Sequence, residues 1–291
     1  MFKGIFTALL TPFDKENKIN EKALEALVRH NRAMGVKGFY VCGSTGEVFL
    51  LSADERKQVM EIVKACAPDA TLIAHIGSIN EAEATDLAKT AERLGYNAIS
   101  SVAPFYYKFS LEEIMGYYNR LADSVSLPML VYHFPAFSGV NMGVGEISRF
   151  LENDKFMGIK FTSNDFFTLE QCKSHFPDKI FYNGFDEMFL SGLSMGADGG
   201  IGSTYNFMAD KFVKIQQLFS ENRIIEAQEV QREVNRIIRI LCRFGVMQTE
   251  KEVLNQLGLD FGECRKPFVA LSDEQKEIVA REIIPRVTPI G

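Results

Sequence analysis

The chain has 291 residues, of which 46% are hydrophobic and 24% charged, with a formal net charge of -6. Its basic residues are scattered, which argues against a nucleic-acid partner, and no apolar run is long enough to predict a membrane span. The apolar run at the N-terminus is too short for a signal peptide. The five cysteines are widely spaced, with no CxxC motif. We therefore expect reduced thiols and a cytoplasmic location.

Short apolar runs recur about every thirty residues along the chain. They are apolar throughout rather than alternating, which is typical of parallel strands covered on both faces. The sequence thus predicts eight strands, at residues 4–10, 38–43, 71–77, 97–102, 128–134, 156–161, 180–185 and 197–202.

Helical segments separate these runs. Three of their starts read as capping boxes, in which a hydroxyl and a carboxylate each satisfy a free backbone N–H group: Ser52 with Glu55, Ser78 with Glu81 and Ser110 with Glu113. Ser272 begins the last helix in the same way. Three glycines that each follow a helical run and precede a strand are expected to be left-handed end caps: Gly35, Gly95 and Gly196.

Eight strand–helix units in succession predict a closed (β/α)₈ TIM barrel of the α/β class. An open doubly wound sheet is the alternative, but it would normally carry a GxGxxG turn after the first strand. The chain is helical after residue 206. We interpret residues 1–222 as the barrel and residues 223–291 as a C-terminal helical extension packed on it.

Polar residues gather where the predicted strands end, which is where chemistry occurs in this kind of barrel. After the second strand, Ser44 and Thr45 in GSTGE form either a small anion cradle or an ordinary helix-capping turn. On the fifth strand, Tyr132 needs a partner for its hydroxyl. His133 should point to the opposite face, as a structural histidine with satisfied ring nitrogens.

Lys160 is the one charge in the apolar sixth strand, within MGIKFT. It could pair with a core carboxylate or extend toward solvent. The alternative is a desolvated amine, whose lowered pKa makes it a neutral nucleophile that forms a Schiff base with a ketone. We favour the second interpretation, because hydroxyl groups and Tyr132 are predicted at the same strand ends.

The seventh strand ends at Gly184, Asp186 and Glu187, whose acids suit either sugar hydroxyls or a helix start. The glycine-rich turn after the eighth strand keeps a phosphosugar enzyme open as another class. The four histidines show no HxxxH or HExxH spacing, so we expect no metal.

Seven motifs in order give the chain a family resemblance over nearly its whole length. They are GSTGE, PFYYKFS, VYHFPAFSGV, GIKFTSND, YNGFDE, GADGGIGSTYN and CRKPF. Together they resemble the N-acetylneuraminate lyase subgroup of the dihydrodipicolinate synthase superfamily. The resemblance implies a homotetramer of barrels that cleaves the sialic acid N-acetylneuraminate reversibly to pyruvate and N-acetylmannosamine, without a cofactor.

The resemblance also implies residue roles. Lys160 would form the Schiff base, and Tyr132 would relay a proton at the hydroxyl on carbon 4. Ser44 and Thr45 would hold the substrate carboxylate and link to Tyr132, and Tyr106 would reach a neighbouring subunit's site and support the proton relay, so that Ser44 and Tyr106 count with Lys160 and Tyr132 as catalytic residues. The sugar chain would be bound by Thr162, Gly184, Asp186, Glu187 and Ser203.

Two positions distinguish this chain within the superfamily. Dihydrodipicolinate synthase carries a carboxylate-binding arginine where this chain has Phe137. His133 stands where relatives often have asparagine, which would affect substrate preference if it faced the site. A sister aldolase for 2-keto-3-deoxy sugar acids, dihydrodipicolinate synthase and a non-enzymatic sugar-acid-binding barrel remain alternatives.

Overall fold

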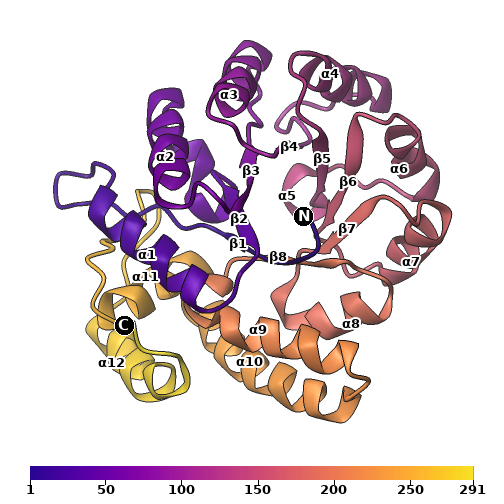
Figure 1. Ribbon diagram of the computed structural model, residues 1–291. Helices are drawn as coiled ribbons and strands as arrows, with labels where there is room; N and C mark the ends of the chain where they lie inside the picture. Colours follow the sequence, from indigo (N-terminus) through magenta and orange to yellow (C-terminus); the bar gives the residue numbers. More distant parts are fainter. Residues whose placement is uncertain (291) are drawn as a thin grey trace.

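The computed structural model describes residues 1–290 and shows eight parallel strands closed into a barrel in chain order (Figure 1). All eight predicted strands are confirmed, although several end one or two residues earlier, where the backbone enters a loop. The strands are β1 (Gly4–Ala8), β2 (Gly38–Val41), β3 (Thr71–His75), β4 (Ala98–Val102), β5 (Met129–His133), β6 (Phe156–Phe161), β7 (Ile180–Asn183) and β8 (Gly199–Gly202).

Helices form a ring around the strands (Figure 1). Those of the barrel are α1 (Glu21–Ala33), α2 (Ala53–Cys66), α3 (Glu81–Arg93), α4 (Leu111–Asp123), α5 (Pro135–Ser138), α6 (Val144–Leu151), α7 (Phe166–His175), α8 (Phe189–Ser194) and α9 (Tyr205–Ser220). Three more follow: α10 (Ile224–Phe244), α11 (Val246–Gln256) and α12 (Asp273–Glu282). Because α10 packs along α9, the boundary expected at residue 223 falls in a turn between contacting helices, and the two-unit division stays a prediction.

The local signals were correct at most helix ends. Ser52, Ser110 and Ser272 form capping boxes, and Gly35, Gly95 and Gly196 have φ of 90°, 72° and 93°. The capping box predicted at Ser78 is wrong. Asn80 caps α3 instead, because its side-chain oxygen accepts from Ala82 N at 3.1 Å directly before the first helical residue.

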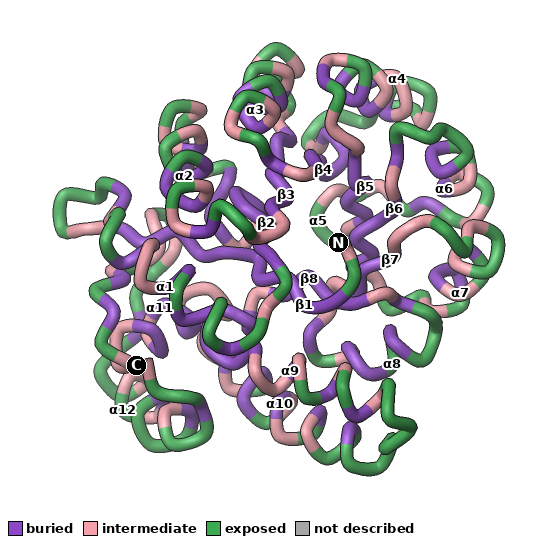
Figure 2. Tube along the Cα trace, in the orientation of Figure 1, coloured by how far each residue is buried: buried purple, intermediate pink, exposed green. Residues whose placement is uncertain are grey.

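Buried residues concentrate in the strands and on the inner faces of the helices (Figure 2). The main core lies between strands and helices, whereas a separate cluster fills the barrel itself with side chains such as Phe6, Tyr40, Leu130 and Tyr182. Tyr132 and Lys160 are register partners on β5 and β6. Their side chains therefore meet above this packed interior, at the end where the strands terminate.

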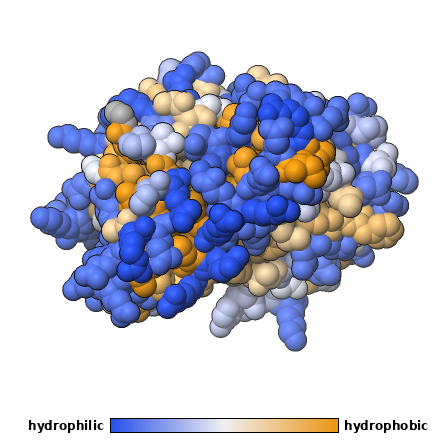
Figure 3. Space-filling view, turned by 90° about the horizontal axis from the view of Figure 1, so that it is seen from below, coloured by the Kyte–Doolittle hydropathy of each residue, from blue (hydrophilic) through white to orange (hydrophobic). Residues whose placement is uncertain are grey.

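Hydrophilic residues dominate the face of the molecule seen in Figure 3, with hydrophobic patches between them. Within residues 1–290, no helix combines the length and the apolar character that crossing a bilayer requires.

A buried ion pair joins the helices after the barrel to the loop that follows β2. Lys251 Nζ on α11 lies 2.6 Å from Glu47 Oε1, with side-chain exposures of 1% and 0%. The second oxygen, Glu47 Oε2, accepts a hydrogen bond from Arg265 N at 2.7 Å. Lys251 also donates to Glu263 O at 3.0 Å. Because Glu47 ends the GSTGE motif, this pair fixes the loop that carries Ser44 and Thr45.

We predict that Lys251→Met lowers the free energy of unfolding by about 3–5 kcal/mol, because it leaves the Glu47 carboxylate buried without its cation. The double variant Glu47→Gln with Lys251→Met should recover part of that loss. Lys155→Met is the control, since Lys155 pairs with Asp123 at the exposed surface, and it should change stability by less than about 1 kcal/mol. Urea unfolding measures all four proteins. Equal, small losses in the two single variants would contradict the prediction.

Candidate active site

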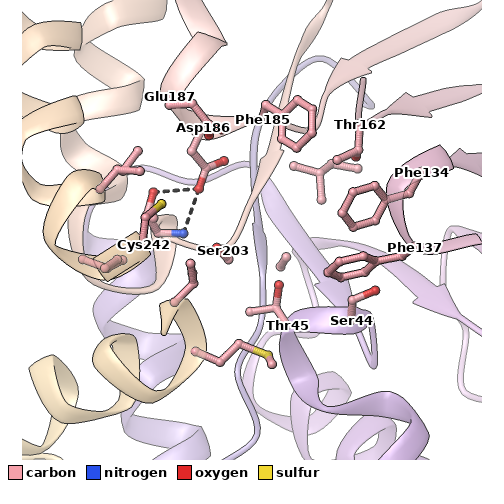
Figure 4. A pocket seen from close by; sticks show the side chains of 18 of the residues that line it. Ser44, Thr45, Phe134, Phe137, Thr162, Phe185, Asp186, Glu187, Ser203 and Cys242 are labelled. Atoms are coloured by element: carbon pink, nitrogen blue, oxygen red, sulfur yellow. Dashed lines mark hydrogen bonds between the residues drawn. The ribbon is translucent and has the colours of Figure 1, made fainter. Parts of the chain in front are cut away.

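A cavity of about 490 Å³ opens where the strands end, and its walls come from two parts of the chain (Figure 4). Strands β5 and β6 and the loops after β2, β6, β7 and β8 contribute most of the predicted site: Ser44, Thr45, Tyr132, Lys160, Thr162, Gly184, Asp186, Glu187 and Ser203. The structure therefore brings together nine of the ten residues predicted from the sequence. Helices α10 and α11 form the remaining wall.

Lys160 is almost fully buried at the base of this cavity, with 4% of its surface exposed. Its Nζ lies 4.0 Å from the ring centre of Tyr132 and 4.5 Å from that of Tyr40. It takes part in none of the lysine ion pairs found in residues 1–290. Burial lowers the pKa of Lys160 to about 7, against an opposing effect of the Asp186 charge. A large fraction of the amine is therefore neutral near pH 7.

Tyr132 lies beside Lys160 on the neighbouring strand. Burial raises the pKa of its hydroxyl to about 12, while polar contacts from the Ser44 and Thr162 side chains act in the opposite direction. The ring is stacked on Phe134, with 5.8 Å between ring centres. The phenol is thus held in place by packing and protonated at neutral pH, and Ser44 and Thr162 line the same cavity.

Ser44 and Thr45 lie on a short 3₁₀ turn, η1 (Ser44–Gly46), on the opposite side of the cavity from Asp186 (Figure 4). The turn is held from two directions: Thr11 Oγ1 donates to Gly46 O at 2.9 Å, and Glu47 is bound by Lys251. Glu47 itself has a left-handed φ of 59°. Such a conformation is unfavourable for a residue with a side chain, so the two anchors are what maintain the loop.

Asp186, at the start of η3 (Asp186–Met188), is the buried acid of the site. Its Oδ2 accepts hydrogen bonds from Thr204 N at 2.9 Å and Thr204 Oγ1 at 2.7 Å (Figure 4). Its Oδ1 is buried and has no hydrogen-bond partner in residues 1–290. Burial raises the pKa of Asp186 to about 6. The unpaired oxygen is a buried acceptor next to Gly202, whereas Glu187 is exposed.

Two glycines in the site leave room for these polar side chains. A Cβ at Gly184 would lie 1.9 Å from Thr162 Oγ1, and a Cβ at Gly202 would lie 1.9 Å from Asp186 Oδ1. Any other residue at either position would displace a polar group from the cavity wall. Gly184 thus contributes space as well as backbone.

Two residues singled out in the sequence lie outside the cavity. Tyr106 does not line it; its side chain is 83% exposed and its φ is 77°. His133 is buried against Phe161, with 5.1 Å between ring centres, and burial lowers its pKa to about 4. It is structural, as predicted, but its Nδ1 has no hydrogen-bond partner in residues 1–290, so the expectation of a satisfied ring was wrong.

Sequence reasoning missed part of the cavity wall. Aromatic residues from the βα loops, among them Phe134 and Phe185, close one side, and α10 and α11 contribute Cys242, Met247 and Gln248. Neither group has a motif that marks it, since apolar residues in loops and on helices look like ordinary core. Only the fold brings them to the strand ends.

The arrangement combines a neutral amine, a positioned phenol, a fixed hydroxyl turn and an acceptor carboxylate around one cavity. A neutral amine attacks a ketone carbon, and the resulting iminium accepts electrons from a neighbouring carbon–carbon bond. The geometry is therefore suited to carbon–carbon cleavage or formation next to a carbonyl group.

The chain is similar to characterised proteins along almost its whole length. Residues 1–284 match the model of the Dihydrodipicolinate synthetase family. N-acetylneuraminate lyases from Fusobacterium nucleatum and Clostridium perfringens are 43% and 44% identical over 283 residues, 97% of this chain and 97% and 98% of theirs.

Solved structures give the same picture. CdNal from Clostridium difficile in complex with mannosamine has a TM-score of 0.96 and 44% identity, covering 99% of this chain and 100% of that one. The Ruminococcus gnavus sialic acid aldolase has a TM-score of 0.93 at 31% identity over 96% and 95% of the two chains, and a catalytic lysine mutant of that enzyme has also been solved.

We predict that the rate at which Lys160 forms an imine with pyruvate rises with pH and levels off. Only the neutral amine attacks, so a pKa of about 7 places the rise between about pH 6 and pH 8. Asp186→Asn removes the charge that favours the ammonium, so its midpoint should lie at lower pH. Borohydride trapping followed by mass spectrometry measures the rate. A midpoint near the ordinary lysine value of about 10.4 would contradict the prediction.

Proposed function

The chain belongs to the dihydrodipicolinate synthetase family, and we propose that it is an aldolase that reversibly cleaves N-acetylneuraminate to pyruvate and N-acetylmannosamine. The observation that carries this proposal is Lys160, a buried amine whose pKa is lowered to about 7, inside a chain whose relatives are named N-acetylneuraminate lyase. The enzyme is thus a carbon–carbon lyase acting on a sialic acid.

In the proposed reaction, Lys160 Nζ attacks the keto carbon of the open-chain sugar acid and water leaves, forming an iminium. The bond between carbons 3 and 4 then breaks, its electrons moving into the iminium as the hydroxyl on carbon 4 loses its proton. Tyr132, neutral because burial raises its pKa, acts as a relay that receives this proton and passes its own toward Ser44. The enamine then takes up one proton at carbon 3, which balances the proton lost from the hydroxyl on carbon 4, and hydrolysis of the resulting iminium releases pyruvate and restores the amine.

We assign binding roles on the same geometry. Ser44 and Thr45 hold the substrate carboxylate on their anchored turn, through hydroxyl and backbone N–H groups. On the other side of the cavity, Thr162, Gly184, Asp186, Glu187 and Ser203 bind the hydroxylated chain. Asp186 Oδ1 is its acceptor, because that oxygen is unpaired within residues 1–290.

The glycines of β8 argue against a phosphosugar enzyme. A Cβ at Gly199 would lie 1.9 Å from Gly4 O, and one at Gly200 would lie 2.3 Å from the Tyr205 hydroxyl oxygen. These glycines permit close packing, and the Asp186 and Glu187 carboxylates beside them would repel a phosphate.

Phe137 separates the proposal from the synthase reaction of the family. It lines the cavity with 72% of its surface exposed, at the position where dihydrodipicolinate synthase carries an arginine. A phenyl ring cannot bind a second substrate carboxylate. The sister aldolase for 2-keto-3-deoxy sugar acids shares the lysine chemistry, and side-by-side rates with the two substrates distinguish it.

We propose that the chain acts in the cytoplasm as a homotetramer in which Tyr106 reaches the site of a neighbouring subunit. The five cysteines are unpaired thiols, which suits a reducing compartment. Aromatic residues are exposed in the segments that follow β4 and β5, including Tyr106, Tyr107 and Phe137, and an interface would cover them. Sedimentation analysis of the intact chain tests the assembly.

We predict that Lys160→Ala abolishes pyruvate release from N-acetylneuraminate in the presence of excess chelator, while circular dichroism shows an intact fold. The reason is that no other group can form the iminium that accepts the electrons. Lys155→Ala, at an exposed lysine away from the cavity, is the matched control and should retain full activity. Appreciable release by Lys160→Ala would exclude the Schiff-base assignment. Activity of the native enzyme that disappears in chelator would show a metal requirement.

Tyr132→Phe should lower turnover by roughly 10²–10⁴-fold, the usual contribution of a positioned proton-transfer group. Formation of the pyruvate imine should change far less, because the phenyl ring still packs on Phe134. Steady-state rates and borohydride trapping measure the two steps separately. Equal losses in both would mean that Tyr132 only shapes the site.

A further inference from the structure

Glu250 on α11 is a buried acid that the proposed reaction does not use. It is 0% exposed, and neither of its carboxyl oxygens has a hydrogen-bond partner in residues 1–290. The adjacent Lys251 does not neutralise it, because that ammonium is paired with Glu47. A carboxyl group left in this state is unfavourable for stability, and an apolar side chain of similar volume would avoid the penalty.

The surroundings of Glu250 point toward the sugar-chain side of the cavity. Ser203, which lines the cavity, is the neighbouring hydroxyl group that acts against the rise of the Glu250 pKa, although the two side chains form no hydrogen bond as they stand. Asp186 lies on the same side and raises that pKa further. The other titratable groups that feel its charge are the thiols of Cys242 and Cys264. Glu250 therefore lies behind the part of the cavity wall that contains Ser203 and does not itself line the cavity.

We propose that Glu250 is a positioning residue that determines specificity for a hydroxylated chain, by orienting the Ser203 hydroxyl into the cavity. As a neutral acid, it donates its O–H to Ser203 Oγ. The proton of Ser203 is then free to point at a substrate hydroxyl oxygen. On the same side of the cavity, Asp186 Oδ1 is a buried acceptor without a hydrogen-bond partner within residues 1–290. One donor and one acceptor side by side recognise neighbouring hydroxyl groups. This inference rests on the proposed function.

The proposal requires Glu250 to be protonated at working pH. Burial raises its pKa to about 8, so the acid is mostly neutral at pH 7 and ionises as pH rises through that value. Once ionised, it can only accept a hydrogen bond. Ser203 would then direct its hydroxyl proton toward the carboxylate and could no longer donate that proton to the sugar.

The test compares Glu250→Gln with Glu250→Leu. Glutamine keeps an N–H donor without a titrating group, so its KM for N-acetylneuraminate should stay within about threefold of the native value at pH 7. Leucine has no donor, so the KM of the Glu250→Leu variant should rise by roughly tenfold, the change in affinity expected when one hydrogen bond to the substrate is lost. In both variants kcat and pyruvate imine formation should stay nearly unchanged, because Lys160 and Tyr132 are untouched.

Two further readouts separate positioning from packing. In a Ser203→Ala background, Glu250→Leu should raise KM no further, because the group it orients is gone. The native KM should rise above about pH 8, and that rise should be absent in Glu250→Gln. An unchanged KM in Glu250→Leu, or an additive loss in the double variant, would overturn the proposal.

Failure of the proposed function can be distinguished from failure of this inference. If the proposed function is wrong, the native protein releases no pyruvate from N-acetylneuraminate. In that case the carboxyl ¹³C resonance of Glu250, identified by its loss in Glu250→Gln, still decides the inference. A carboxyl group that is ionised at pH 7 would overturn it independently of any activity.

Discussion

The chemistry of this protein depends on the burial of one amine, that of Lys160. Burial disfavours an ammonium at the position of Lys160, where the nearest groups include the aromatic rings of Tyr40 and Tyr132, and the charge of Asp186 offsets this effect only in part. A large fraction of the group is therefore neutral near pH 7, the form in which it is a nucleophile. The barrel makes this possible because its interior is packed with side chains up to the level of β6 Lys160, so water reaches the amine only from the cavity side.

A second buried cation, Lys251, supports the opposite wall of the cavity. Unlike Lys160, it is part of an ion pair. Lys251 stays paired because Glu47 lies 2.6 Å away, and the pair ties α11 to the turn that carries Ser44 and Thr45. The helices after the barrel are therefore part of the active-site structure. They fix the hydroxyl turn through Glu47 and close the cavity with residues such as Cys242 and Met247.

Much of the fold could be predicted because each strand and most helix ends depend on local signals. Continuous apolar runs, capping boxes and left-handed glycines are properties of a few adjacent residues. Asn80 shows the limit, because Ser78 and Asn80, two positions apart, could each cap α3, and the one directly before the first helical residue does so. Site residues on motifs at strand ends were also predictable, since parallel strands bring those ends together.

The rest of the site could not be predicted because it depends on packing between distant segments. Nothing near Glu47 in the sequence indicates that Lys251 is its partner. Glu250 lies on a helix, where a glutamate ordinarily faces solvent, so its burial could not be predicted either. Gly184 resembles a turn residue until the position of Thr162 shows which atom a side chain would displace. Such facts become visible only when the two segments are in place.

The buried ionisable groups of this chain divide according to their partners. Glu47 and Lys251 neutralise each other and hold the structure together. Lys160, Asp186 and Glu250 have perturbed pKa values caused mainly by burial, and all three lie in or directly behind one cavity. Burial of an unpaired ionisable group is unfavourable for folding, so packing alone does not account for three of them at one place. Their shared location is explained if each supplies a protonation state that the reaction or its substrate needs: a neutral amine, an acceptor carboxylate and a donor acid.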